Sequence, residues 1–304
     1  MFVKVVNSDG SPISDIQLNY EVQKYIDELI PPLSSSSTEE DPPKTVMLLP
    51  PDYTRYHSKA GTICSNIYKS SVDSPSSSNE GEGKISSRYK VTDVMPALGT
   101  HSPMSNPQLL KMFGPEMTNA KPGIFRVHDW RNDVITIGEA PSHMIKKATG
   151  GLLNVPWPAQ VNKLVWDGGH DIVLSIGQVV PHEVMGMANY NKNLFIGVGG
   201  SDAINLSHFI GAVYGMEKMM GRSSNPLREI LNYCSEKFLL NRLNLHYVLT
   251  VMGSNQTTGE LEMKGKYLKQ GGVTKLFLER GGRVRERWRR REGKVKGKWL
   301  TVKS

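Results

Sequence analysis

The stretch between residues 172 and 208 constrains the fold of this chain more than any other part of the sequence. It opens with the apolar run Ile172–Ile176 and contains a second one, Leu194–Val198, and Gly or Pro bounds both. Short runs of this kind predict strands buried on both faces of a parallel α/β sheet. In such sheets, functional groups lie just beyond the carboxyl ends of the strands. Three side chains able to hold a metal or move a proton lie there: His182, Lys192 and His208.

Similar apolar runs alternate with helical patterns along most of the chain. Further strands are expected at Thr45–Leu49, Val91–Leu98 and Leu245–Met252, and two short ones at 2–6 and 16–22. Helix-starting residues and helical spacing predict helices from about Lys59, after Ser105, from Ser201 and from Pro226. This alternation predicts an α/β fold with a mostly parallel sheet flanked by helices.

Charge divides the chain into two parts after Met263. Residues 264–304 hold 15 Lys and Arg against three Glu, a charge of +12 within a total of +8, so residues 1–263 carry −4. The first part is expected to be one α/β domain with flexible, Ser-rich insertions near 31–43 and 70–88. The second part lacks an apolar period and helix caps, and we expect it to be a basic, disordered tail.

Composition also indicates where the protein works. No apolar run approaches the roughly 18–20 residues that a membrane-spanning helix needs. The N-terminus lacks the pattern of a secretory signal. Cys64 and Cys234 are isolated thiols rather than a CxxC pair, which favours a reducing compartment. The sequence therefore predicts a cytoplasmic protein with no membrane partner.

Two motifs in the central stretch match known patterns only in part. HEVMG has Gly186 where a zinc-protease helix has its second histidine, which excludes that function. GVGGSD follows an apolar run and precedes a helical one, so its backbone amides, including those of Gly199 and Gly200, could bind a phosphate. The motif lacks the third glycine of the dinucleotide-binding pattern, so it is a weak signal by itself.

Polar side chains also follow two other expected strands. Arg55, three residues after Asp52 in PPDYTR, could bind a carboxylate or phosphate through two hydrogen bonds, or form a surface ion pair. His101, in GTHSPM, could be a general base or a structural histidine. Taken one at a time, these residues do not distinguish a functional role from a structural one.

Their order along the chain is more informative. PPDYTR, GTHSPM, PHE followed by Lys192, and then His208 occur in sequence, each close behind an apolar run or a turn. Over about residues 44–263 this set resembles the nickel-dependent lactate racemase family, which is built around a nickel-pincer nucleotide. The resemblance makes residues 1–263 a cofactor-binding domain. It implies a racemase or epimerase of 2-hydroxy acids that works by proton-coupled hydride transfer through a 2-keto acid.

The resemblance also implies a role for each matching residue. A lysine at the position of Lys192 is joined covalently to a pyridinium mononucleotide, which holds nickel through two sulfurs and a ring carbon and carries the hydride. A histidine matching His208 is the fourth nickel ligand. Histidines matching His101 and His182 form an acid/base pair on opposite faces of the substrate, a role suited to imidazole near neutral pH. The enzymes that synthesise the cofactor are then expected partners, beside the small hydroxy acid.

The remaining matches concern binding. The position of Arg55 resembles one that grips the substrate carboxylate. Asp52 is expected in the same site, as a cofactor contact together with Gly199 and Gly200. The implied chemistry requires that the two acid/base histidines, the lysine and the nickel-binding histidine gather around a single crevice.

The sequence departs from the family pattern in three places. Ala188–Asn191 stands where a Gly-Gly-Ala run often precedes the lysine, and Ser102 stands where Arg is frequent. Both changes suggest a hydroxy acid other than lactate, such as a larger polyol acid. No residue after Lys264 can be matched to the family's second α/β domain, so this lid is expected to be missing and activity to be weak or absent.

Two alternatives remain open at this point. A catalytically inactive, truncated homologue would keep the fold and leave Lys192 unmodified. A nucleic-acid-binding protein would use the basic tail, in which Trp288 and Trp299 stand among Lys and Arg. Such runs of like charge are more often solvated tails than binding surfaces.

Overall fold

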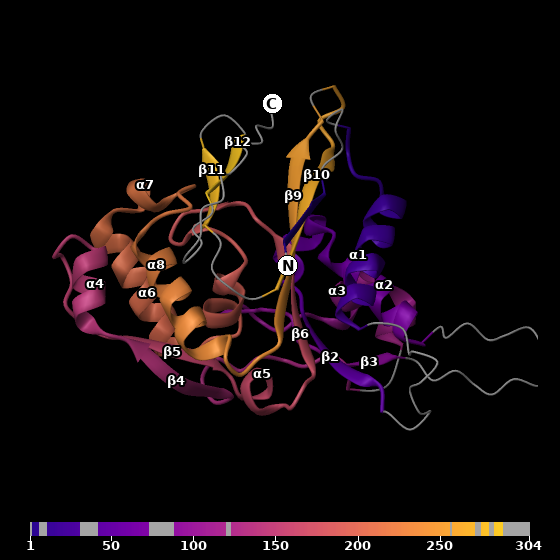
Figure 1. The fold of residues 1–304 in the computed structure, drawn as a ribbon, viewed down its shortest axis with the longest axis horizontal. Helices are drawn as coiled ribbons and strands as arrows, with labels where there is room; N and C mark the ends of the chain where they lie inside the picture. Colours follow the sequence, from indigo (N-terminus) through magenta and orange to yellow (C-terminus); the bar gives the residue numbers. More distant parts are fainter. Residues whose placement is uncertain are drawn as a thin grey trace, which may run out of the picture.

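The computed structural model describes residues 2–5, 11–30, 42–72, 88–119, 123–255, 257–270, 275–279 and 283–287. Its centre is a six-stranded sheet in the order β1-β10-β9-β6-β2-β3 (Figure 1). The strands are β1 (Phe2–Val5), β2 (Lys44–Leu49), β3 (Tyr89–Val94), β6 (Ile172–Gln178), β9 (Leu245–Ser254) and β10 (Leu261–Gln270). β3, β2, β6 and β9 are parallel, and β10 and β1 extend the sheet with antiparallel pairing. The expected mostly parallel α/β sheet is confirmed.

The central strands are buried on both faces, because successive side chains of a strand point to opposite sides of the sheet. All seven residues of β6 are buried. In β2, Val46 and Leu48 belong to one hydrophobic cluster, and Met47 and Leu49 belong to another. Each face of the sheet therefore has its own core, which explains why these strands are continuous apolar runs in the sequence.

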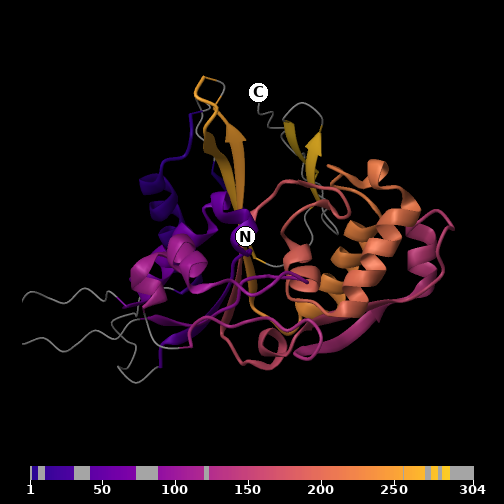
Figure 2. The ribbon, with the colours of Figure 1, turned by 180° about the vertical axis from the view of Figure 1, so that it is seen from behind.

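Helices cover both cores. The first core lies under α1 (Asp15–Leu29), α2 (Ala60–Val72) and α3 (Asn106–Thr118) (Figure 1). The second includes α4 (Ser142–Ala148), α6 (Ser201–Tyr214), α8 (Pro226–Cys234) and the antiparallel pair β4 (Val134–Ala140) and β5 (Trp157–Asn162) (Figure 2). The shorter elements are α5 (Lys163–Asp167), β7 (Pro181–His182), β8 (Gly186–Met187) and α7 (Met216–Met219). Within the described ranges, no helix is both long enough and apolar enough to span a membrane.

The strand expected at 16–22 is wrong, because these residues lie within helix α1. Every second residue of this segment is apolar, which is typical of a strand. In the structure, however, Ile16 and Tyr20 are exposed. The residues that reach the core are spaced three or four apart, as on one face of a helix: Leu18, Val22, Tyr25 and Ile26.

The strand expected at Leu194–Val198 is also wrong. Asn193–Gly197 forms a π-helical turn, η2, and all five of its residues are buried. A short run that is apolar on all sides carries no period, so a strand and a helical turn cannot be distinguished from it. Two other irregular turns are η1 (Tyr53–Ser58), which is 3-10 helical, and the π-helical η3 (Ser235–Leu239).

The sheet continues past the domain boundary expected at Met263. Strand β10 runs to Gln270 between β9 and β1, so the basic segment expected to be disordered begins inside the sheet. Backbone hydrogen bonds hold a strand of this kind, and they require no apolar pattern. Farther on, β11 (Lys275–Glu279) and β12 (Arg283–Arg287) form an antiparallel pair. The rest of the expected tail, 288–304, and most of both expected insertions lie outside the described residues.

Candidate functional site

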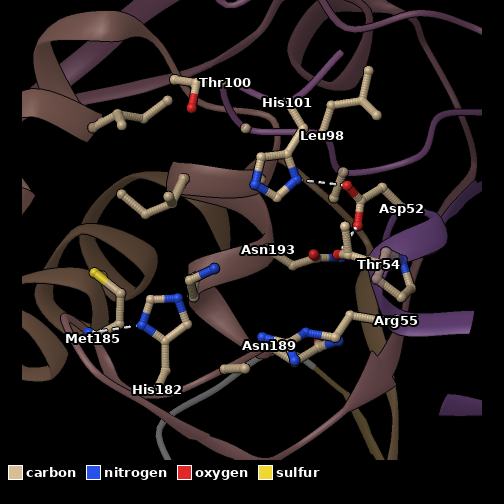
Figure 3. Close-up of a pocket in the computed structure, with 18 of the residues that line it drawn as sticks. Asp52, Thr54, Arg55, Leu98, Thr100, His101, His182, Met185, Asn189 and Asn193 are labelled. Atoms are coloured by element: carbon tan, nitrogen blue, oxygen red, sulfur yellow. Dashed lines mark hydrogen bonds and ion pairs between the residues drawn. The ribbon is translucent and has the colours of Figure 1, made fainter. Parts of the chain in front are cut away.

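A cavity opens beyond the carboxyl ends of β2 and β6, where the sequence places the chemistry. Six of the predicted site residues line it: Asp52, Arg55, His101, His182, Lys192 and His208. Figure 3 shows Asp52, Thr54 and Arg55 on one side of the cavity, and His182 with Met185 on the other. We call the set Asp52, Thr54, Arg55 and His101 the first wall, and the set His182, Lys192 and His208 the second wall.

An aspartate and a histidine form a hydrogen-bonded pair in the first wall. Asp52 precedes η1 and is buried, whereas the His101 side chain is 59% exposed. The Nδ1 of His101 lies 2.6 Å from Asp52 Oδ2, and the Thr54 hydroxyl donates to the other carboxylate oxygen at 2.5 Å (Figure 3). Since a carboxylate only accepts hydrogen bonds, the imidazole proton lies on Nδ1. The Nε2 lone pair of His101 is therefore available to take a proton.

Arg55 adds a cation to the same wall. It lies within η1 and lines the cavity. Among the ion pairs of the described residues, none involves Arg55. A guanidinium with free N–H groups is suited to hold a planar carboxylate through two hydrogen bonds.

His182 has the opposite hydrogen-bonding arrangement. Its Nδ1 accepts from the backbone amides of Val184 and Met185, each at 3.2 Å. The proton of the neutral ring therefore lies on Nε2. Burial, followed by the positive charge of Lys192, lowers the pKa of His182 to about 4. This histidine is consequently neutral near pH 7 and is a hydrogen-bond donor in this conformation.

Lys192 has the properties of a reactive amine. It directly precedes η2, and burial together with the charges of Arg55 and Arg228 lowers its pKa to about 8. A larger fraction of its amine is then unprotonated near neutral pH than for an ordinary lysine, and the unprotonated form is the nucleophile. The adjacent Asn193 fixes the turn to the sheet, since its amide donates to Leu49 O and Ser175 Oγ, both at 3.0 Å.

The backbone before Lys192 has an unusual conformation. Asn189 and Tyr190 both have φ near +59°, in the left-handed region that glycine favours. These two residues lie in the segment where the resemblance expects a Gly-Gly-Ala run. The Asn189 side chain accepts from the Tyr190 backbone amide at 2.7 Å, and the Tyr190 ring packs against Tyr247 with centroids 4.6 Å apart. Local contacts therefore hold non-glycine residues in a conformation that glycine would adopt without strain.

His208 is oriented as a metal ligand would be. Its Nδ1 donates to the carbonyl of Ile204, one turn earlier in α6, at 2.7 Å. This bond leaves the Nε2 lone pair free, and metal-bound histidines usually donate their second ring nitrogen in this way. Among the described residues, no group of three or more His, Cys, Asp or Glu could hold a metal ion. His208 is therefore the residue whose free imidazole nitrogen could contribute a single ligand to a metal ion at this cavity.

The two predicted glycines do not line this cavity. A Cβ on Gly199 would overlap the carbonyl oxygen of Phe195, and one on Gly200 would overlap the side chain of Gln160. The Gly199 carbonyl accepts from Nε2 of the buried His128 at 2.9 Å. Close packing therefore explains both glycines, and their predicted contact with a cofactor phosphate has no counterpart in the cavity wall.

Sequence reasoning missed several polar residues of the cavity, and Thr54 and Gln178 are two of them. Thr54, the residue before Arg55, holds the Asp52 carboxylate from the side away from His101. Gln178 is the last residue of β6 and follows its buried run at the carboxyl end of the strand. Its place at a carboxyl strand end was the signal that could have identified it.

Comparison with known proteins gives structural matches only. No protein-family model matches the chain, and no curated protein matches it in sequence. A crystal structure of a Thermotoga maritima protein, from the Northeast Structural Genomics Consortium, has a TM-score of 0.67 and 21% identity, over 86% of this chain and 56% of that chain. The lactate racemase apoprotein from Thermoanaerobacterium thermosaccharolyticum has a TM-score of 0.56 and 17% identity, over 86% and 53%. The chain has a lactate racemase-like fold and spans little more than half the length of either protein.

Proposed function

We propose that this chain is the cofactor-binding part of a 2-hydroxy-acid racemase or epimerase that uses a nickel-pincer nucleotide. One observation carries the proposal. Six residues that match the racemase motifs, far apart in sequence, line a single cavity at the carboxyl ends of parallel strands. The lactate racemase-like fold supports it independently of those motifs.

The second wall would hold the cofactor. The amine of Lys192 is the proposed point of attachment, and the Nε2 of His208 would be a nickel ligand, because an imidazole nitrogen suits nickel. When bound, such a nucleotide would supply a hydride acceptor and donor for the α-carbon of the substrate. The hydrogen bond from His208 to Ile204 fixes the ring orientation that such a ligand needs.

The first wall would bind the substrate and take its hydroxyl proton. Arg55 is proposed to hold the carboxylate of the 2-hydroxy acid. The Nε2 of His101 then accepts the proton of the 2-hydroxyl group, and the Asp52 carboxylate stabilises the imidazolium that forms. Loss of the hydroxyl proton is what allows the α-hydrogen to leave with its electron pair, giving a planar 2-keto acid.

His182 is proposed to serve the opposite enantiomer. To accept a proton at Nε2, its neutral ring must first carry its proton on Nδ1, where two backbone amides now point. Both of these hydrogen bonds are 3.2 Å long, at the upper end of the ordinary range for an N–H donor. Acid/base geometry often tightens only when substrate binds, so a small rotation of this ring is part of the proposal.

The decisive experiment measures attachment rather than turnover. The full chain is produced together with the cofactor-synthesis enzymes, and the peptide containing Lys192 is weighed by mass spectrometry beside a nickel determination. We expect a nucleotide-sized mass increase on this peptide and nickel approaching one per chain, and neither in Lys192→Arg. Unmodified, metal-free protein from cells that load a lactate racemase would contradict the proposal.

A second candidate is a chain that binds the cofactor but does not turn over substrate. The observation in its favour is the state of His182, whose low pKa of about 4 and whose hydrogen bonds from two backbone amides at Nδ1 oppose its role as a base. A loaded chain that leaves enantiopure 2-hydroxy acids unchanged would favour this candidate. Interconversion of enantiomers by the loaded chain would exclude it.

A further inference from the structure

Helix α8 contains a buried arginine that has no acidic partner. Arg228 is 8% exposed, and its Nη2 donates to the carbonyl oxygen of Met187 at 2.7 Å. Nη1 has no hydrogen-bond partner, and no ion pair among the described residues includes Arg228. Burial lowers its pKa to about 10, so the side chain stays charged near pH 7. A cation buried without a counter-ion destabilises the folded state, so its presence calls for an explanation.

The bond to Met187 fixes the start of the segment that leads to Lys192. This segment contains the two left-handed residues described above and ends at Asn191. Its end is held as well, since Asn191 accepts from the Tyr247 hydroxyl at 2.7 Å and donates to Asn232, another residue of α8, at 2.9 Å. Helix α8 therefore supports both ends of the segment, through residues that do not line the cavity.

The positive charge of Arg228 also acts on the amine of Lys192. Burial, then Arg55, then Arg228 lower the pKa of this amine, whereas Glu183 and Asp52 raise it. Of these charged side chains, only Arg228 does not line the cavity. The effect of the others changes when a ligand enters, and a substrate carboxylate would neutralise Arg55. Arg228 is enclosed by protein, so its charge acts on the amine whatever the cavity holds.

We propose that Arg228 is a positioning residue for Lys192, which holds the preceding segment through Met187 and keeps a permanent positive charge near the amine. Such a charge favours the neutral amine, which is the nucleophile that attachment of a cofactor requires. Three histidines also line the cavity, and His182 is neutral near pH 7 and adds no charge. The inference rests on the proposed function for the group that Lys192 receives, and it adds a residue outside the cavity that prepares the lysine to react.

The test measures the reactivity of Lys192 in the full chain without cofactor. Trace labelling with acetic anhydride acetylates unprotonated amines, and mass spectrometry of the peptide that contains Lys192 gives the rate at each pH. The exposed Lys90, at the start of β3 and so at the end of the sheet opposite to the cavity, is the internal reference. The ratio of the two rates, followed against pH, gives the midpoint of Lys192 acetylation.

Arg228→Met removes the charge and keeps a side chain of similar length. The midpoint of Lys192 acetylation should rise by about one pH unit, and the rate at pH 7 should fall about fivefold or more, as the loss of one buried charge allows. Arg242→Gln is the matched control, because it removes an exposed arginine that pairs with Asp167, and it should leave the midpoint unchanged. An unchanged midpoint in Arg228→Met would overturn the inference. So would a slower rate at every pH with the same midpoint, which is the result that a purely structural role predicts.

A second variant keeps Arg228 in place. Asn232→Asp supplies the missing anion one helical turn after the arginine and retains an oxygen that can accept from Asn191. The added charge offsets that of Arg228, so the midpoint of Lys192 acetylation should rise here too. If Arg228→Met does not fold, this variant decides the question, and an unchanged midpoint in it would overturn the inference.

The failure of this inference and the failure of the proposed function give different results. A Lys192 peptide that carries the nucleotide, in a chain whose acetylation midpoint does not respond to Arg228→Met, leaves the proposed function intact and overturns only the role of Arg228. A midpoint that responds as expected, in a chain that the cofactor-synthesis enzymes leave unmodified, supports the role of Arg228 at the amine and counts against the proposed function.

Discussion

The two walls of the cavity are built in different ways. The first wall follows regular parallel strands, and its histidine is held by a carboxylate through Nδ1. The second wall comes from a two-residue strand, a π-helical turn and a helix, and its histidine is held by backbone amides through Nδ1. Two imidazoles in one cavity therefore differ in which ring nitrogen carries the proton.

This difference indicates a division of labour. The hydrogen bond from Nδ1 to Asp52 leaves Nε2 of His101 free to accept, whereas burial and the nearby cation Lys192 oppose the charged form of His182. Burial and the charge of Arg55, which both lower the pKa of His182, also lower the pKa of Lys192. We infer that the second wall is organised around cofactor attachment, and that the first wall is organised around proton transfer.

The largest effect should come from removing the proposed nickel ligand. His208→Ala is expected to lower the bound nickel while Lys192 remains modified, because it removes the one proposed nickel ligand that the protein supplies and leaves the three that the nucleotide supplies. His101→Ala, which changes the other wall, should retain nickel at the wild-type level. Metal analysis and peptide mass on the two variants measure this directly. Equal nickel contents in the two variants would mean that metal binding is not a property of the second wall alone.

The next largest effect should come from the carboxylate of the first wall. Asp52→Asn keeps the size of the side chain but removes the charge that stabilises the His101 imidazolium and fixes its tautomer. In loaded protein, kcat/KM should fall by about 10²–10⁴-fold, the range seen when a histidine base loses its carboxylate. Nickel content should not change. A loss of less than about threefold would remove Asp52 from the proton-transfer step.

The pH dependence of stability should reflect the second wall. The pKa of His182 is about 4 in the folded chain, below the ordinary value of 6.5. As pH falls from 6.5 towards 4, the unfolded chain gains a proton that the folded chain does not. The free energy of unfolding therefore decreases over this pH range. Above pH 6.5 the contribution of His182 to the free energy of unfolding is fully present. His246 acts in the same direction, because burial lowers its pKa to about 4.

Chemical unfolding at several pH values measures this linkage. In His182→Gln, up to one proton fewer should be taken up on unfolding between pH 6.5 and 4. The pH dependence of the free energy of unfolding should become shallower in the variant without disappearing, because His246 still contributes to it. An identical dependence in the wild-type chain and the variant would mean that His182 is freely protonated in the folded state.

The smallest expected effect concerns the turn that supports the first wall. Lys59 follows η1 with φ +63°, a left-handed conformation that strains a residue with a Cβ. Lys59→Gly should raise the free energy of unfolding by about 0.5–1 kcal/mol. Lys59→Ala retains the strain and loses only an exposed ion pair with Asp15, so it should change stability by less than about 0.5 kcal/mol. Denaturant titration of the three proteins provides the comparison.

Part of the fold could be predicted from the sequence for a clear physical reason. The runs that became β2, β6 and β9 are apolar because both faces of these strands are buried, and that pattern is local. The capping box at Ser105 and the proline at the start of α8 also act within one helical turn. Two predictions failed for different reasons. The alternating apolar pattern at 16–22 is typical of a strand, although these residues lie in helix α1. Strand β10 was missed because backbone pairing with β9 and β1 holds it, and its own sequence has no strand pattern.

The sequence by itself determined which residue types could carry the chemistry and the order in which they follow the strands. Ordered motifs were sufficient to place six residues in one site, because the carboxyl ends of parallel strands meet at the same edge of a sheet. Only the tertiary structure decided that Nδ1 of His101 faces a carboxylate and Nδ1 of His182 faces backbone amides. It also decided that Gln178 Oε1 has no hydrogen-bond partner among the described residues. The contact of His101 with Asp52 joins segments 49 residues apart in the chain, and no local pattern records it. The amides that face His182 come from the turn that follows it, and only the conformation of that turn brings them to the ring.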